Sequence, residues 1–96
     1  MSEVYNDPVH LAWKDTLQCI DDLMQLGLLE HLKSVSISRF ENNKLYLATS
    51  SDRIFNYLTS STVLSHVYVL ARPCFEKHGL ELNELVIEKI QAGNEF

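Results

Sequence analysis

The sequence lacks the features that would assign it to a membrane or an export pathway. Its 96 residues contain no apolar run of about 18 residues, the minimum for a membrane-spanning helix. Its start, MSEVYNDPVH, has neither the basic nor the apolar region of a signal peptide. We therefore expect a cytoplasmic protein without a membrane partner. The length fits a single domain over residues 1–96, ordered from about 7 to 90 and ending in a frayed tail at 91–96.

Cysteine is scarce, because the chain has only Cys19 and Cys74. Two cysteines are too few for a disulfide scaffold, and buried free thiols are expected in a reducing compartment. Cys74 and His78 have a helical spacing that suits one metal ion, but no further cysteine or histidine has a matching spacing for a zinc site. A Cys–His nucleophile pair also lacks an orienting third group. The sequence therefore predicts no metal, no cofactor and no enzymatic activity.

Positive charge is scarce too, since eight Lys and Arg stand against thirteen Asp and Glu, for a net charge of -5. A protein whose main ligand is a nucleic-acid phosphate backbone usually carries a basic face. In this chain the Lys and Arg residues are instead scattered along the sequence. The glycines form no Gly-x-x-Gly loop for KH-type RNA binding, and no Walker motif is present. Nucleic acid is thus expected to be a weak ligand at most, and a protein partner fits better.

The first third of the chain reads as two helices. Asp7 can cap a helix in which Pro8 takes the first position. Over residues 9–26, apolar side chains recur at spacings of three and four, as on one helical face; they are Trp13, Leu17, Ile20 and Met24. Gly27 is predicted to cap this helix and residues 28–33 to form a short second one.

Acidic side chains lie at or beyond the margin of the first helix's apolar face. Asp15 sits at the margin, and Asp21 and Asp22 fall outside it. We interpret them as a solvated helix face. A docking surface for a basic partner is the alternative.

The pattern changes to a period of two after residue 34. Residues 34–40 and 44–47 come close to alternating around Asn42 and Asn43, which predicts a β-hairpin. A final strand over residues 85–88 would pair with this hairpin.

The segment between the hairpin and the final strand is less clear-cut. Ser50 or Ser51 can cap a third helix. Residues 59–72 suit either helix or strand. We favour one long helix, distorted near Ser60 and again near Pro73, that closes at His78–Gly79. The predicted class is α+β, in the order helix, helix, strand, strand, helix, strand.

This order, with residues at particular places, resembles domain I of the bacterial replication initiator DnaA, a KH-like domain. Trp13 stands where that family usually has a Trp, and Leu32 stands at the position of a second one. The hairpin segment 42–47 and the helix start 52–58 (DRIFNYL) also match the family pattern. Similar domains occur in the clamp-loader tau subunit and in the DciA helicase loaders.

The resemblance implies a protein-binding adaptor in bacterial DNA replication. Such a domain would dock the replicative helicase, an initiator or a replication regulator, and could form a homodimer through its first helix. One alternative is a tau-type interaction domain that binds a DNA polymerase III subunit. A second alternative is a KH-like domain that binds single-stranded nucleic acid weakly.

Candidate interface residues follow from the resemblance and from helical spacing. Trp13 is either a core residue or, with its neighbours, a partner patch. Phe55 and Leu58 are expected to share the core-facing side of the third helix, which would turn Ile54 to the rim. The resemblance assigns the residue after Arg53 to a helicase-binding surface. The predicted protein-binding residues are Ala12, Trp13, Leu17, Leu28, Glu30, Arg53 and Ile54.

Overall fold

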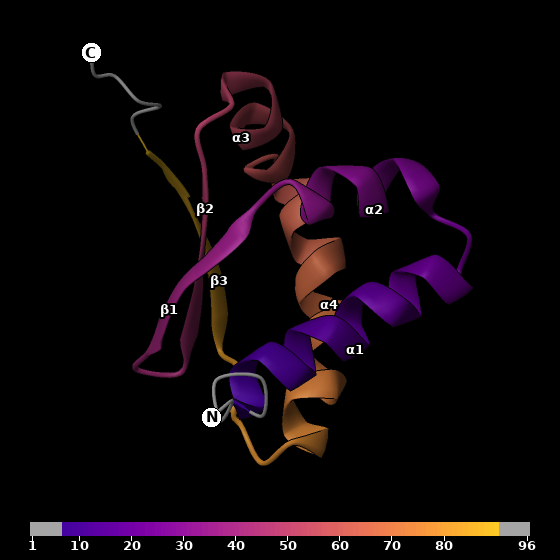
Figure 1. The fold of residues 1–96 in the computed structure, drawn as a ribbon, viewed down its shortest axis with the longest axis vertical. Coiled ribbons are helices and arrows are strands. Elements are labelled where there is room, and N and C mark those ends of the chain that lie inside the picture. Colours follow the sequence, from indigo (N-terminus) through magenta and orange to yellow (C-terminus); the bar gives the residue numbers. More distant parts are fainter. Residues whose placement is uncertain (1–6, 91–96) are drawn as a thin grey trace.

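In a computed structural model of the chain, residues 7–90 are described, and they form helices packed on one face of a small sheet (Figure 1). The predicted α+β class is confirmed, and the arrangement is compatible with a small KH-like fold. The predicted tail, residues 91–96, lies outside the described residues.

Helix α1 (Pro8–Asp22) begins as its sequence predicts and ends earlier than expected. The Asp7 carboxylate accepts a hydrogen bond from the Val9 N–H at 3.2 Å, which confirms the cap. The chain leaves the helix at Met24, whose φ of 62° lies in the left-handed region. Helix α2 (Leu26–Lys33) then includes Gly27 in its first turn, so the predicted capping role of Gly27 is wrong.

Strands β1 (Ser36–Glu41) and β2 (Lys44–Thr49) form the predicted antiparallel hairpin. Asn42 and Asn43 both adopt positive φ angles, 55° and 63°, which a tight hairpin turn requires and Asn tolerates. Strand β3 (Glu84–Lys89) pairs in parallel with β2, so β2 is the central strand.

The predicted long third helix is instead two helices, α3 (Asp52–Leu58) and α4 (Ser61–Lys77). The break falls at Thr59, whose hydroxyl donates to the Phe55 carbonyl oxygen at 2.8 Å. Pro73 lies inside α4 without ending it. The helix closes at His78, followed by Gly79 with φ 79°, as the sequence predicts. Residues 59–72 are therefore mainly helical. Of the two structures that the sequence allowed for this segment, helix is correct and strand is wrong.

The core lies between the sheet and the helices that cover one of its faces (Figure 1). Leu45 and Leu47 point into it from β2, and the Phe75 ring of α4 stacks on Phe40 of β1 at a centroid distance of 5.9 Å. Burial of apolar side chains such as these is the main stabilising contribution to a domain of this size. The largest side chains with almost no exposure are Phe75, Ile20, Leu32, Leu45, Leu47, Leu58, Leu82, Val67 and Thr16.

Candidate protein-binding surface

The residues predicted to form a patch on α1 belong to the core instead. Ala12 is fully buried and Trp13 is only 7% exposed. The core alternative for Trp13 is therefore correct, and neither side chain is presented to a partner. Leu17 is half-buried and lines a hollow of about 220 Å³ between α1 and α2.

Ile54 is also buried, at 7% exposed, so its predicted place at the rim is wrong. Helix α3 begins after Ser51, whose side chain accepts a hydrogen bond from the Ile54 N–H at 3.2 Å, and it packs Ile54 into the core cluster. Ile54 and Leu58, four residues apart, share the core-facing side, and Phe55 is only half-buried. Arg53, the neighbour of Ile54, is exposed as expected.

Three predicted residues nevertheless meet in one place, a hollow of about 130 Å³ between α2 and α3. Glu30 and Arg53 contribute charged side chains to its wall, and Ile54 contributes an apolar one. His31 and Ser34 complete the lining. We call these five residues the α2–α3 hollow.

His31 connects the two helices of this hollow, and nothing in the sequence analysis pointed to it. Its Nδ1 lies 2.8 Å from the Gly27 carbonyl oxygen, and because a carbonyl can only accept, Nδ1 carries the proton. In the neutral ring Nε2 then accepts from Arg53 Nη1 at 3.4 Å. The ring stacks on Tyr57 of α3 at a centroid distance of 4.1 Å. Within residues 7–90 the Arg53 guanidinium forms no ion pair with a carboxylate, so its charge is available to a partner.

A larger, mostly apolar groove of about 310 Å³ lies beyond the His31–Tyr57 stack, between α2, α3 and α4. The buried Leu28 belongs to its wall, and at one end Gln25 Oε1 accepts from His66 Nε2 at 2.7 Å. We call it the α2–α4 groove; it is lined by Gln25, Gly27, Leu28, Tyr57, Thr62, Val63 and His66.

Comparisons with known proteins found no match at any of three levels. No protein family, no curated protein and no solved structure matches the chain. The α2–α3 hollow and the α2–α4 groove are the two candidate binding sites described above.

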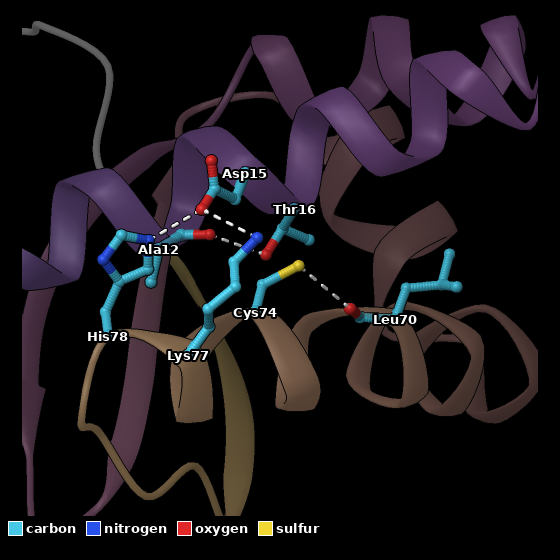
Figure 2. A network of polar contacts seen from close by, with 7 residues as sticks. All are labelled: Ala12, Asp15, Thr16, Leu70, Cys74, Lys77 and His78. Carbon is cyan, nitrogen blue, oxygen red and sulfur yellow. Dashed lines mark hydrogen bonds and ion pairs between the residues drawn. The ribbon is translucent and has the colours of Figure 1, made fainter.

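A polar cluster joins α1 to the end of α4 (Figure 2). His78 Nε2 donates to Asp15 Oδ2 at 2.7 Å, and Lys77 Nζ lies 3.6 Å from the same oxygen. The hydrogen bond from His78 is the main reason why the pKa of Asp15 lies below its ordinary value, and the positive charge of Lys77 adds to it. The Asp15 side chain therefore links α1 to α4. It is only partly exposed, whereas we expected it to be fully solvated.

The two cysteines are half-buried free thiols. The Cys74 thiol donates to the Leu70 carbonyl oxygen at 3.6 Å, one turn back along α4, while His78 follows one turn ahead and faces Asp15 (Figure 2). The thiol and the imidazole thus have separate partners. Among residues 7–90, no group of three or more His, Cys, Asp or Glu is placed to hold a metal ion.

The sheet face opposite the helices carries a cluster of interactions centred on Arg39. Arg39 lies over the Tyr46 ring at 3.8 Å from its centroid. Its guanidinium also pairs with Glu41 at 2.8 Å and with Glu88 at 3.2 Å. On this face the Tyr46 ring is covered by Arg39, and the Arg39 guanidinium is paired with two carboxylates.

In the part of the chain that is described, no helix is long and apolar enough to cross a bilayer.

Proposed function

We propose that this chain is a non-enzymatic adaptor that binds a protein of the bacterial DNA replication machinery, with the α2–α3 hollow as its docking site. The observation that carries the proposal is that Glu30 and Arg53 flank one opening, over an apolar wall formed by Ile54. Protein interfaces generally have an apolar centre and a polar rim, and arginine is enriched among the residues that contribute most to binding.

The arrangement of Arg53 supports binding in a defined orientation. Its contact with His31 uses one nitrogen and leaves the other N–H groups of the guanidinium to donate to a partner carboxylate. The stack of His31 on Tyr57 fixes α2 against α3, so the site is held in place before a partner arrives. In DnaA-like domains, which the chain resembles, the helicase docks near the start of the third helix, and this is where Arg53 lies.

Other classes of function receive less support from the described residues. Stacking of bases on the sheet would require the Tyr46 ring, which Arg39 already covers. A cysteine nucleophile would require a base at the Cys74 thiol, which instead donates to a backbone carbonyl. We therefore expect neither strong nucleic-acid binding nor catalysis.

The proposal is tested with the purified replicative helicase of the cell from which the chain comes. Arg53→Ala should weaken binding at least tenfold, about 1.4 kcal/mol, and leave the melting temperature nearly unchanged, because Arg53 is exposed. Arg72→Ala is the matched control, since Arg72 is an exposed arginine on α4 whose partner is Glu76. Binding is measured by surface plasmon resonance and stability by thermal denaturation.

The results separate the candidate partners. Helicase binding that depends on Arg53 and not on Arg72 supports the proposal. No binding to helicase, but Arg53-dependent binding to a clamp-loader or DNA polymerase subunit, would favour the tau-type alternative. Equal effects of the two variants would exclude the α2–α3 hollow as the docking site.

A further inference from the structure

An exposed apolar turn joins α1 to α2 at the side of the molecule farthest from the sheet (Figure 1). Met24 is 76% exposed, and Leu23 and Leu26 on either side of it are about half exposed. We call these three residues the apolar turn. Met24 also has a positive φ, which a long side chain rarely adopts, so the turn presents an apolar residue at a position that Gly or Asn would suit better.

The apolar turn borders the α2–α4 groove. This groove is lined by Gln25 and Gly27, which are sequence neighbours of Met24 and Leu26. Its wall continues through Leu28 and Val63. A ligand that covers the apolar turn would therefore also reach a concave apolar site beside it. Methionine suits such a surface because its flexible side chain adapts to different partners.

The charge next to the apolar turn is negative. Asp21 and Asp22 are exposed in the last turn of α1, where the carbonyl ends of the helix already favour cations. Asp22 accepts a hydrogen bond from Gln18 at 3.0 Å, and within residues 7–90 neither carboxylate forms an ion pair with a cation. Asp21 shares a hollow with Lys14 and Lys33 but forms an ion pair with neither, so a partner that contacts the apolar turn would meet two carboxylates that form no ion pair within the described residues.

This charge argues against a second copy of the chain as the occupant. A two-fold contact centred on Met24 would bring the same surface of each copy together and place four carboxylates near one another. Like charges at an interface are unfavourable and suppress such pairing. The complementary ligand is one that combines large apolar side chains with lysine or arginine.

We propose that the apolar turn and the α2–α4 groove together bind an amphipathic helix of a partner protein that carries basic residues beside its apolar face. The apolar side chains of that helix would cover Met24 and enter the groove, and its basic residues would face Asp21 and Asp22. The inference deepens the proposed function and rests on it in one respect, because it takes the ligand to be a protein.

The test uses a fluorescein-labelled helical peptide with leucines at i, i+3, i+4 and i+7 and lysines beside them, and a companion peptide with glutamates for the lysines. Binding is followed by fluorescence anisotropy at low and high salt. The double variant Met24→Asn/Leu26→Gln removes the apolar turn; Asn suits a positive φ and Gln favours helix, so the fold is retained. Val69→Gln is the control, because Val69 is an exposed apolar residue of α4 outside the groove lining.

We expect the double variant to bind the lysine peptide at least about tenfold more weakly and Val69→Gln to stay within about twofold of the original chain. Asp21→Asn/Asp22→Asn should reduce the dependence of binding on salt. The glutamate peptide should bind poorly. Equal losses in the double variant and the Val69→Gln control, or equal affinity for both peptides, would overturn the inference.

The two proposals fail in different ways. Helicase binding that depends on Arg53 but is indifferent to the apolar turn, with no peptide bound there, would remove this inference and leave the proposed function standing. Peptide binding at the apolar turn without any helicase binding would do the opposite.

Discussion

Truncation of the buried Trp13 side chain should affect stability and not association. Because Trp13 lies in the core, Trp13→Ala should leave a large cavity and destabilise the fold by about 3–5 kcal/mol. The loss is measured by urea denaturation followed by circular dichroism. A stable Trp13→Ala protein that sediments as a smaller species than the original would restore the self-association patch on α1.

The contact between Asp15 and His78 has a consequence for the dependence of stability on pH. The pKa of Asp15 lies below its ordinary value of 3.8, chiefly because His78 donates a hydrogen bond to the carboxylate. The contact therefore adds stability above that ordinary value and loses it as the pH falls through the lower, folded-state pKa. Asp15→Asn should lower the urea midpoint at neutral pH, and its difference from the original chain should shrink in acid. Asp21→Asn, which removes an acidic charge from α1 without breaking an ion pair, is the control, and an equal loss in both would contradict the assignment.

At the scale of the elements, α3 is a short helix that begins with a side-chain cap. It has seven residues and is too short to be stable by its own helical propensity. Ser51→Ala removes the acceptor of the Ile54 N–H and should cost about 1 kcal/mol in unfolding free energy. The neighbouring Ser50→Ala, which removes a serine that does not cap the helix, should cost much less. Two equal urea midpoints would mean that the Ser51 cap does not stabilise α3.

The sequence was a good guide to elements whose ends are marked by local chemistry. Asp7–Pro8, Asn42–Asn43 and His78–Gly79 each stand where the structure begins or turns an element, because these residues favour a particular backbone conformation in any context. The turn at Met24 was missed, since methionine has no preference for a positive φ and only packing of α1 and α2 can impose it.

The candidate site was harder to predict than the fold. Spacing alone allowed either Phe55 or Ile54 to face inward, and the packing of α3 against the rest of the core decides for Ile54. His31 and Arg53 are 22 residues apart and meet only because α2 and α3 pack together. Tertiary contacts of this kind leave no local signal in a single sequence.

At the scale of the whole molecule, the distribution of charge explains why nucleic acid should be a poor ligand. Five of the eight Lys and Arg residues pair with carboxylates of the chain itself; they are Arg39, Lys44, Arg72, Lys77 and Lys89. The remaining three are Lys14 and Lys33, which share the hollow between α1 and α2 with Asp21, and Arg53, which contacts His31. No continuous cationic track results within residues 7–90, so few counterions would be released on contact with phosphates.

Titration with a labelled single-stranded oligonucleotide tests this consequence of the charge distribution. At physiological salt we expect a dissociation constant no tighter than the range of about 10⁻⁴ to 10⁻⁶ M that is typical of non-specific binding. The variant Lys14→Ala/Lys33→Ala should weaken any residual binding, because it removes two of the three cations that lack a carboxylate partner. Submicromolar affinity would show that phosphates are recognised without a basic face, and the proposed function would then have to give way to the nucleic-acid-binding alternative.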